Sequence, residues 1–424
     1  MNAILILVGL LVLSYLGSFL VGGRSVRGLG LPSGVEYAAL GFVLGPRALG
    51  LVGGDNLAAF EPVVQVALGW LAFVIGLDFG FAGEKRVRAG SLVLGSMSAL
   101  LTGGAAACAA WFTMDRLGVG GTSTDRILLA GGVGAACAQT TRHAIRWIVD
   151  RDEGHSPLAD RLNEIAHTDD FFPLIAVAVL FALEPTRDIA MKVPLRDWPA
   201  ITIGLGLLLG AGSALLLRSE MPIEDTWAVL FGVSLIAIGA ATRLGISTLT
   251  VCFFMGIAVS ALTGHHGELR AMVGPTERPI LLPALVLAGA RIDFRASPAL
   301  PWIAAAAIGG RLVAKVVFGW LLATGSRPAR KAGPLVGLSL MSSGALAMCI
   351  GLAFALRFPG VVGDTVLAIS ALAATVGEFV GPIRLRRALL AAGEIVDAKA
   401  SPADAAKGSP PSDETRDSRG GAPI

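Results

Sequence analysis

The stretch NEIAHTDDFFPLIAVAVLF, from Asn163 to Phe181, places two adjacent acids, Asp169 and Asp170, directly before a long apolar run. A carboxylate at the centre of a bilayer costs about 2.5–3.5 kcal/mol even on the more lenient scale. Pro157 and the charged residues before it favour a helix that begins near Asp160, which puts the pair roughly 15 Å deep at about 1.5 Å per residue. A helix that began at the pair itself would leave both acids among the headgroups. The deeper placement requires the chain to supply a cation, a proton or a polar cavity.

The composition predicts an integral membrane protein. Hydrophobic residues make up 54% of the 424 residues, charged residues make up 15%, and the mean hydropathy is +0.72. A soluble domain carries about 25% charged residues. The net charge is only +3 and no basic patch is interleaved with aromatic residues, so we expect no nucleic acid as a partner. The polar residues form no nucleophile–base arrangement, so we expect neither an enzyme nor a cofactor.

Apolar runs separated by charged or Gly/Pro-rich breaks predict about thirteen helices, which defines an all-α polytopic membrane protein. The first twenty residues lack a basic segment and a cleavage site, so we expect a spanning helix there rather than a removed signal peptide. The predicted helices cover residues 2–21, 34–52, 62–82, 90–113, 126–148, 160–183, 198–217, 226–242, 245–263, 279–291, 299–324, 333–356 and 361–383.

The loops between these helices predict an orientation. Lys and Arg favour one side by about two to one, which predicts the N-terminus outside and the C-terminus in the cytoplasm. Residues 393–424 are rich in Pro, Ser, Gly, Ala and charge and cannot bury enough apolar surface to fold. We therefore expect a transmembrane domain over residues 1–392 and a disordered cytoplasmic tail over residues 393–424.

Two stretches in the chain echo each other. LAFVIGLDFGFAG, from Leu71 to Gly83, and LVLAGARIDFRAS, from Leu285 to Ser297, both run from apolar residues through a Gly to an acid followed by Phe. In the predicted orientation Asp78 falls near the inside face and Asp293 near the outside face. Related motifs on opposite faces are typical of inverted repeats in transporters.

Two further stretches, Ala130–His143 and Gly337–Ile350, are rich in small and hydroxyl residues inside apolar runs. Small residues either let intact helices pack closely or allow a helix to unwind. Broken helices present free carbonyls and helix ends, which can stabilise an ion. Both interpretations stay open at the level of the sequence.

Cations also lie inside the predicted spans. Pro301–Leu322 holds Arg311 and Lys315 four residues apart, so both lie on one helix face. The simplest partners are Asp169 with Lys315 or with Arg311, although such pairs can also serve only to fix helix packing. An acid left without a fixed partner can hold either a proton or a metal cation. That competition at one site, opened to each side in turn, is sufficient for cation/proton exchange.

On its motifs the chain resembles the bacterial monovalent cation:proton antiporter-2 family, which includes sodium/proton antiporters and glutathione-gated potassium efflux proteins. The resemblance runs from about Leu31 to Arg387 and rests on LPSGVEYAALGFVLGPRALGLV (Leu31–Val52), RLGISTLTVCFFMGIAVS (Arg243–Ser260), RLVAK (Arg311–Lys315) and, most specifically, the pair Asp169-Asp170. Two positions depart from the usual pattern, because Glu36 and Ala314 stand where the family has Gly.

The resemblance implies a thirteen-helix fold with inverted repeats, a core domain that moves like an elevator and a dimerisation domain. It implies a homodimer in the bilayer of a bacterial inner membrane. Asp170 would bind the monovalent cation, sodium or potassium, in alternation with the proton, and Asp169 would pair with Lys315. Two broken helices would cross near the acids, with Gln139, Thr140 and Thr141 in one and Ser342, Ser343 and Gly344 in the other.

Some residues near the acids differ from the family pattern. Arg142 and His143 follow Thr141 where apolar residues are expected, and His167 precedes the acidic pair. His143 and His167 are candidates for pH sensing, since His titrates near neutral pH, or they have structural roles. Two alternative functions stay open. One is a sodium-coupled symporter for a small organic anion that would bind Arg311 and Lys315, and the other is a sensor that transports nothing.

Overall fold

The computed structural model describes residues 34–79, 89–151, 156–184, 193–217, 222–263 and 266–395. Every regular element in these ranges is a helix, which confirms the all-α prediction. Every predicted helix from residue 34 onward coincides with one helix or with two consecutive ones. The predicted helix at residues 2–21 and the tail from residue 396 lie outside the described residues.

The helices follow one another along the chain in a fixed order. They are α2 (Val35–Leu44), α3 (Gly54–Ala59), α4 (Glu61–Asp78), α5 (Ala89–Leu117), α6 (Ser123–Ala138), α7 (Arg142–Arg151), α8 (Pro157–Thr168), α9 (Phe171–Ala182), η1 (Leu195–Asp197), α10 (Trp198–Leu216), α11 (Ile223–Leu244), α12 (Thr248–Leu262), α13 (His266–Val273), η2 (Gly274–Thr276), α14 (Glu277–Arg291), α15 (Leu300–Gly325), α16 (Arg327–Ala332), η3 (Pro334–Leu340), α17 (Ala345–Arg357) and α18 (Val361–Ala392).

Many of these helices are long and apolar enough to cross a bilayer. Among the described residues seven helical segments meet that description, and an eighth does if the bent pair η3 and α17 forms one span. The helices α2 and α12 are apolar but shorter. The count of about thirteen predicted spans is therefore approximate, because several predicted spans consist of short or broken helices.

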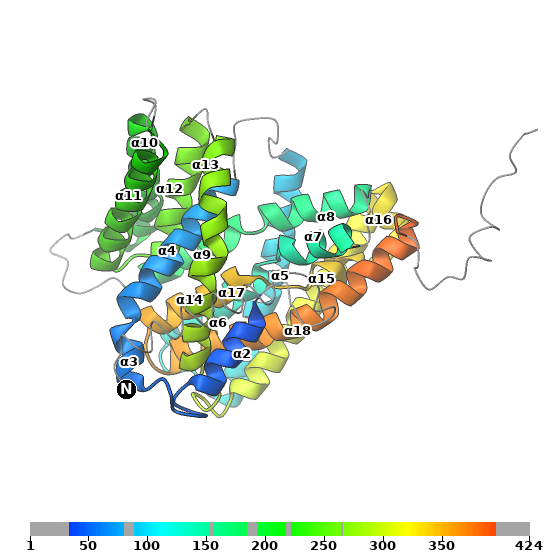
Figure 1. Ribbon diagram of the computed structural model, residues 1–424. Coiled ribbons are helices and arrows are strands. Elements are labelled where there is room, and N and C mark those ends of the chain that lie inside the picture. Colours follow the sequence, from blue (N-terminus) through cyan, green and yellow to red (C-terminus); the bar gives the residue numbers. More distant parts are fainter. Residues whose placement is uncertain are drawn as a thin grey trace, which may run out of the picture.

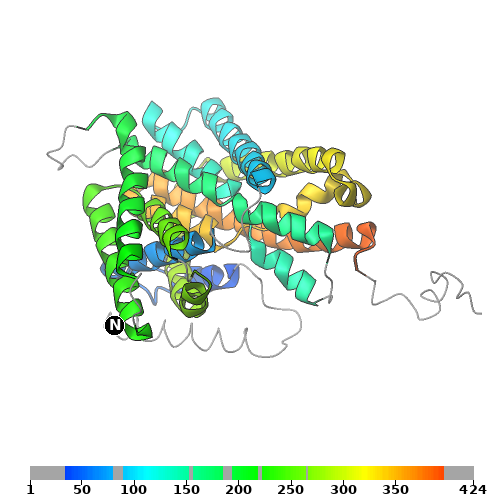
Figure 2. The ribbon, with the colours of Figure 1, turned by 90° about the horizontal axis from the view of Figure 1, so that it is seen from above.

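The helices form two groups by their contacts. The scaffold group comprises α2, α4 and α10 to α14, in which α12 packs against α4 and α10, and α14 packs against α2 and α4. The crossing group comprises α5 to α9, α15, η3, α17 and α18, in which α5 packs against α6, α8 and α15. The helices α4 and α10 to α13 stand at one side of the molecule, whereas α8 and α18 extend to the other (Figure 1). Seen from above, the green helices α10 and α11 lie along one edge and the yellow helix α15 lies far from them (Figure 2).

Glycines allow helix pairs of the scaffold group to touch backbone to backbone, and two of these pairs are α2 with α14 and α4 with α12. A Cβ atom added at Gly289 of α14 would lie 1.9 Å from the Ala38 carbonyl oxygen of α2. A Cβ atom added at Gly256 of α12 would lie 2.3 Å from the Phe73 carbonyl oxygen of α4. Only small residues permit such an approach between membrane helices.

Two predicted spans are broken near their middle, and a third has a junction there at which the helical course continues. The helix α6 ends at Ala138 and α7 begins at Arg142, while η3 and α17 meet at a bend of 58° across residues 341–344. The two small-residue stretches are therefore breaks in helices and not merely sites of close packing. The third junction lies between α8 and α9, where Pro173 has no N–H to donate to the carbonyl of residue 169.

Candidate functional site

The acidic pair lies at the junction of α8 and α9. Together these helices form one 26-residue span, Pro157–Ala182, and the pair occupies its middle. Asp169 is completely buried and Asp170 is 5% exposed. Both residues keep right-handed helical backbone angles, so the span continues through them. The helix begins well before the pair, at Pro157, and not at the pair itself.

The two breaks cross beside the acids and are hydrogen-bonded to each other. The backbone N–H of Thr141 donates to the Ser342 carbonyl at 2.9 Å. The backbone N–H of Gly344 donates to Gln139 Oε1 at 2.6 Å. The structure thus brings the two broken segments together, as the resemblance implied. Ser343 is fully buried at the same crossing.

Gln139 connects this crossing to Asp170. A backbone N–H can only donate, so the bond from Gly344 requires the side-chain oxygen of Gln139 to face it. The amide nitrogen Nε2 must then face the other way, where it donates to Asp170 Oδ1 at 3.1 Å. One side chain therefore fixes both the second break and one oxygen of the acid.

Asp169 and Lys315 do not form a direct ion pair. Asp169 Oδ1 accepts a bond of 3.3 Å from the backbone N–H of Thr140, and Asp169 Oδ2 has no hydrogen-bond partner. Lys315 Nζ donates to Thr140 Oγ1 at 2.8 Å and to Ser98 Oγ at 3.1 Å. Thr140 therefore lies between the two charges and contacts both. The predicted pairing is replaced here by an indirect one.

Arg311 binds the crossing rather than an acid. It is completely buried, and its Nη2 donates to the Gln139 carbonyl at 3.0 Å and to the Met341 carbonyl at 2.9 Å. These carbonyls follow the C-terminal ends of α6 and η3, where a helix carries partial negative charge. The guanidinium thus stabilises two converging helix ends, and the expected contact with Asp169 is not formed.

The two candidate histidines lie apart from each other. His143 is about half exposed, and its Nε2 lies 3.6 Å from Glu277 Oε1. His167 packs against Phe79, with ring centroids 5.1 Å apart. His143 lines the cavity described next, whereas His167 does not.

A cavity of about 370 Å³ opens onto Asp170. It lies between the crossing group and the scaffold group, and its wall includes both acidic and basic side chains. Asp169, Arg311 and Lys315 are not among the residues that line it. Its polar lining residues are Glu36, Tyr37, Gln139, Thr141, Arg142, His143, Asp170, Glu277 and Arg278.

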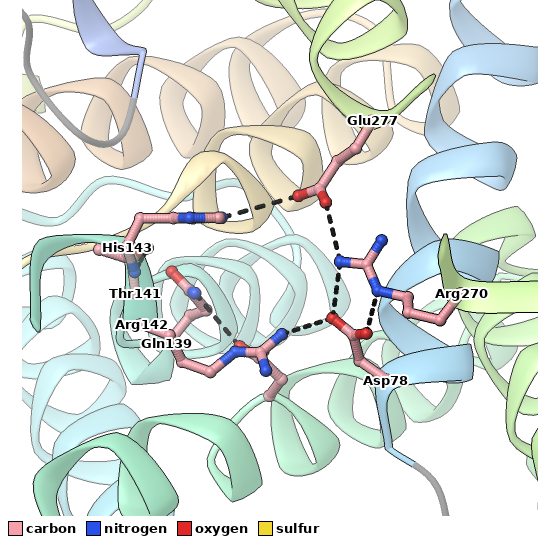
Figure 3. A network of polar contacts seen from close by, with 8 residues as sticks. Asp78, Gln139, Thr141, Arg142, His143, Arg270 and Glu277 are labelled. Atoms are coloured by element: carbon pink, nitrogen blue, oxygen red, sulfur yellow. Dashed lines mark hydrogen bonds and ion pairs between the residues drawn. The ribbon is translucent and has the colours of Figure 1, made fainter. Parts of the chain in front are cut away.

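A charged network at this cavity joins the two helix groups (Figure 3). Asp78 accepts from Arg142 Nη2 at 2.8 Å and from Arg270 Nη2 at 3.0 Å. Arg270 Nη2 also donates to Glu277 Oε2 at 3.3 Å. The sequence drew attention to Asp78 and Arg142 but not to Arg270 and Glu277. Arg270 and Glu277 lie in the charged segment between two apolar runs, and this position is the feature of the sequence that could have indicated them.

The comparisons with known proteins identify the family. Residues 15–390 match the family described as "Sodium/hydrogen exchanger, transmembrane". The fold is similar to that of the sodium proton antiporter MjNhaP1 from Methanocaldococcus jannaschii, with a TM-score of 0.68 at 15% identity over 92% of this chain and 99% of that chain. No curated protein matches the chain. The resemblance to monovalent cation:proton antiporters is thereby confirmed, and the chain belongs to the sodium/hydrogen exchanger family, which is a family of transporters and not of enzymes.

Proposed function

We propose that the protein exchanges a monovalent cation for protons across a membrane, with Asp170 as the group that binds both. The observation that carries this proposal is the position of Asp170. It is buried at the middle of a span, it is hydrogen-bonded to the crossing through Gln139, and it lines the cavity. We take sodium as the first candidate cation, because the structural relative is a sodium proton antiporter, and potassium as the second.

Exchange follows from competition for one carboxylate. An ionised Asp170 can hold a cation, whereas a protonated Asp170 has no charge with which to attract one. Asp169 supplies a second buried acid, and Thr140 places the Lys315 ammonium close to it. In this proposal Asp169 and Lys315 balance each other's charge and Asp170 alone changes its occupant.

Inverted repeats are part of the proposal and have support in the scaffold group. Arg47 follows α2 and pairs with Asp293, which follows α14, at 2.5 Å. Arg270 follows α12 and pairs with Asp78, which ends α4. Glycines also bring α2 into backbone contact with α14, and α4 with α12. Each helix pair thus combines an Arg–Asp ion pair with close glycine contacts, which supports a repeat.

The orientation and assembly remain predictions. The cavity carries Arg142 and Arg278, which the distribution of Lys and Arg assigns to the inside, so in this proposal it opens to the cytoplasm. The bacterial inner membrane, the homodimer and the elevator-like movement follow from the resemblance alone. The cytoplasmic tail lies outside the described residues from residue 396 onward.

The organic-anion symporter has no support in this geometry. Its anion would need Arg311 and Lys315, but neither lines the cavity. Arg311 already donates to two carbonyls, and Lys315 already donates to two hydroxyls. The observed contacts therefore support cation/proton exchange over symport of an organic anion.

The test is cation-driven proton movement in everted vesicles from a host that lacks its own antiporters. A pH-sensitive dye reports the response to sodium, potassium and lithium for the wild type, Asp170→Asn and the matched control Asp115→Asn. Asp115 pairs with Arg126 on an exposed surface, so its loss has little effect. We expect a response in the wild type and the control that Asp170→Asn abolishes. A folded wild type that responds to no cation across a range of pH would contradict the proposal.

A further inference from the structure

A permanent cation stands beside the proposed carrier carboxylate. Arg142 opens α7 directly after the break and lines the same cavity as Asp170. A guanidinium stays charged at any physiological pH and forms bidentate bonds with carboxylates. A free Arg142 is therefore a direct competitor of a transported monovalent cation.

Asp78 holds this guanidinium in place. Its Oδ2 accepts the bond from Arg142 Nη2 at 2.8 Å, and the Arg142 side chain is 16% exposed. Asp78 is itself fixed by Arg270, which donates Nε to Oδ1 and Nη2 to Oδ2. Figure 3 shows Asp78 between the two guanidiniums, with Arg270 also reaching Glu277.

The ion pair of Asp78 with Arg142 connects the two helix groups. Arg142 belongs to α7 in the crossing group, whereas Asp78 ends α4 and Arg270 lies in α13 of the scaffold group. The carboxylates of Asp78 and Glu277 balance the guanidiniums of Arg142 and Arg270 in charge. His143 lies beside Glu277. Removing the Asp78 charge leaves one largely buried guanidinium without its partner, which is strongly unfavourable.

The cavity offers three other carboxylates to a released Arg142. Glu277 already contacts Arg270 and His143. Glu36 comes from α2 on the scaffold group. Asp170 belongs to the same helix group as Arg142, and one residue of the break, Gln139, already touches it. A contact of Arg142 with Asp170 therefore stays within one helix group, whereas contacts with Glu36 or Glu277 span both groups.

We propose that Asp78 is a positioning residue that keeps Arg142 away from Asp170, and that a released Arg142 occupies the cation site. This inference rests on the proposed function, since it concerns the affinity of that same site. Asp78 thus helps to set the cation concentration at which the exchanger works. The competing interpretation is that the Asp78–Arg142 pair only braces the helices.

The test compares four variants by the cation concentration that gives half-maximal exchange. Asp78→Asn releases Arg142. We expect the half-maximal cation concentration to rise by about tenfold or more, because the attraction between the Arg142 and Asp170 charges in contact competes strongly with cation binding. Arg142→Gln removes the competitor, and we expect a value equal to or below that of the wild type. The double variant Asp78→Asn/Arg142→Gln is expected to return to the wild-type value.

The matched control is Asp78→Asn/Arg270→Gln. It restores the same net charge and removes the same carboxylate, but it leaves Arg142 free. We therefore expect it to stay impaired like Asp78→Asn. Because both double variants keep the charge balance, their comparison decides the question even where Asp78→Asn alone does not fold. Cation-dependent thermal stabilisation of the purified variants gives a second readout that needs no transport.

The possible outcomes separate this inference from the proposed function. A wild type without exchange contradicts the proposed function. A wild type with exchange, together with equal values for the two double variants, overturns only the role given to Arg142. An unchanged half-maximal concentration in Asp78→Asn also overturns it. The inference is supported if Arg142→Gln restores the half-maximal cation concentration of Asp78→Asn to the wild-type value and Arg270→Gln does not.

Discussion

The side chain of Gln139 accepts a hydrogen bond from the backbone of Gly344 at 2.6 Å, and this bond fixes one broken helix against the other. The same side chain donates to Asp170, so the geometry of the crossing and the position of the acid depend on one amide. Gln139 is 4% exposed, and water cannot readily replace its contacts. The crossing should therefore be sensitive to any change at this residue.

Gln139→Met keeps the size of the side chain but removes both bonds. The buried N–H of Gly344 loses its partner, which costs about 1–3 kcal/mol. We expect a lower thermal unfolding temperature in detergent and slower exchange at saturating cation. An unfolding temperature equal to that of the wild type would show that the bond to Gly344 contributes nothing to the crossing.

Thr140 is expected to act through its hydroxyl. Thr140→Val keeps the shape but leaves Lys315 with only Ser98, so we expect a loss of about 1–3 kcal/mol in unfolding free energy. Thr140→Ser keeps the hydroxyl and is the matched control, for which we expect nearly wild-type stability. Thermal unfolding of both purified variants provides the measurement. If Thr140→Val and Thr140→Ser lose the same unfolding free energy, the effect does not come from the hydroxyl group of Thr140.

Arg311 is expected to stabilise the crossing rather than to bind a substrate. Arg311→Met removes the donor of two buried carbonyls, at Gln139 and Met341, and each unpaired group costs about 1–3 kcal/mol. We expect a large fall in unfolding temperature, with the half-maximal cation concentration of any folded fraction unchanged. A changed half-maximal concentration in a protein of normal stability would place Arg311 at the ion site.

Gly289 is expected to tolerate no side chain. A methyl group there would meet the Ala38 carbonyl at 1.9 Å, so Gly289→Ala must push α14 from α2, at about 1–3 kcal/mol. Gly309 of α15 has nothing within 4 Å of an added Cβ atom, and Gly309→Ala is the matched control. We expect the control to be neutral or slightly stabilising, since Ala favours helix over Gly. Comparable losses in both variants would argue against the close contact.

Competition at Asp170 predicts how exchange depends on pH. Protons and cations exclude each other at one carboxylate, so each weakens the binding of the other by the same factor. At acidic pH, where protons occupy Asp170, we expect the half-maximal cation concentration to rise by up to about tenfold per pH unit. The rate at saturating cation should change much less. Titration of the dye response at several pH values checks this, and a half-maximal concentration independent of pH would contradict a shared site.

The sequence predicts the elements of the site because they are local. The depth of Asp169 and Asp170 follows from the start of the helix and its rise per residue. The two breaks follow from runs of small and hydroxyl residues, and Arg311 and Lys315 share a face because they are four residues apart. Each of these properties depends only on neighbours in the chain.

Only the tertiary structure decides which charges meet. The sequence paired Asp169 with Lys315 or with Arg311. In the structure Thr140 lies between Asp169 and Lys315. Arg311 instead donates to one backbone carbonyl of each break. Asp78 receives Arg142 and Arg270 from positions 64 and 192 residues away. Spacing within a helix fixes the face on which a charge lies, but the partner depends on how separate helices are placed. That placement arises from backbone contacts at glycines and from the crossing of the two breaks, which no local pattern records.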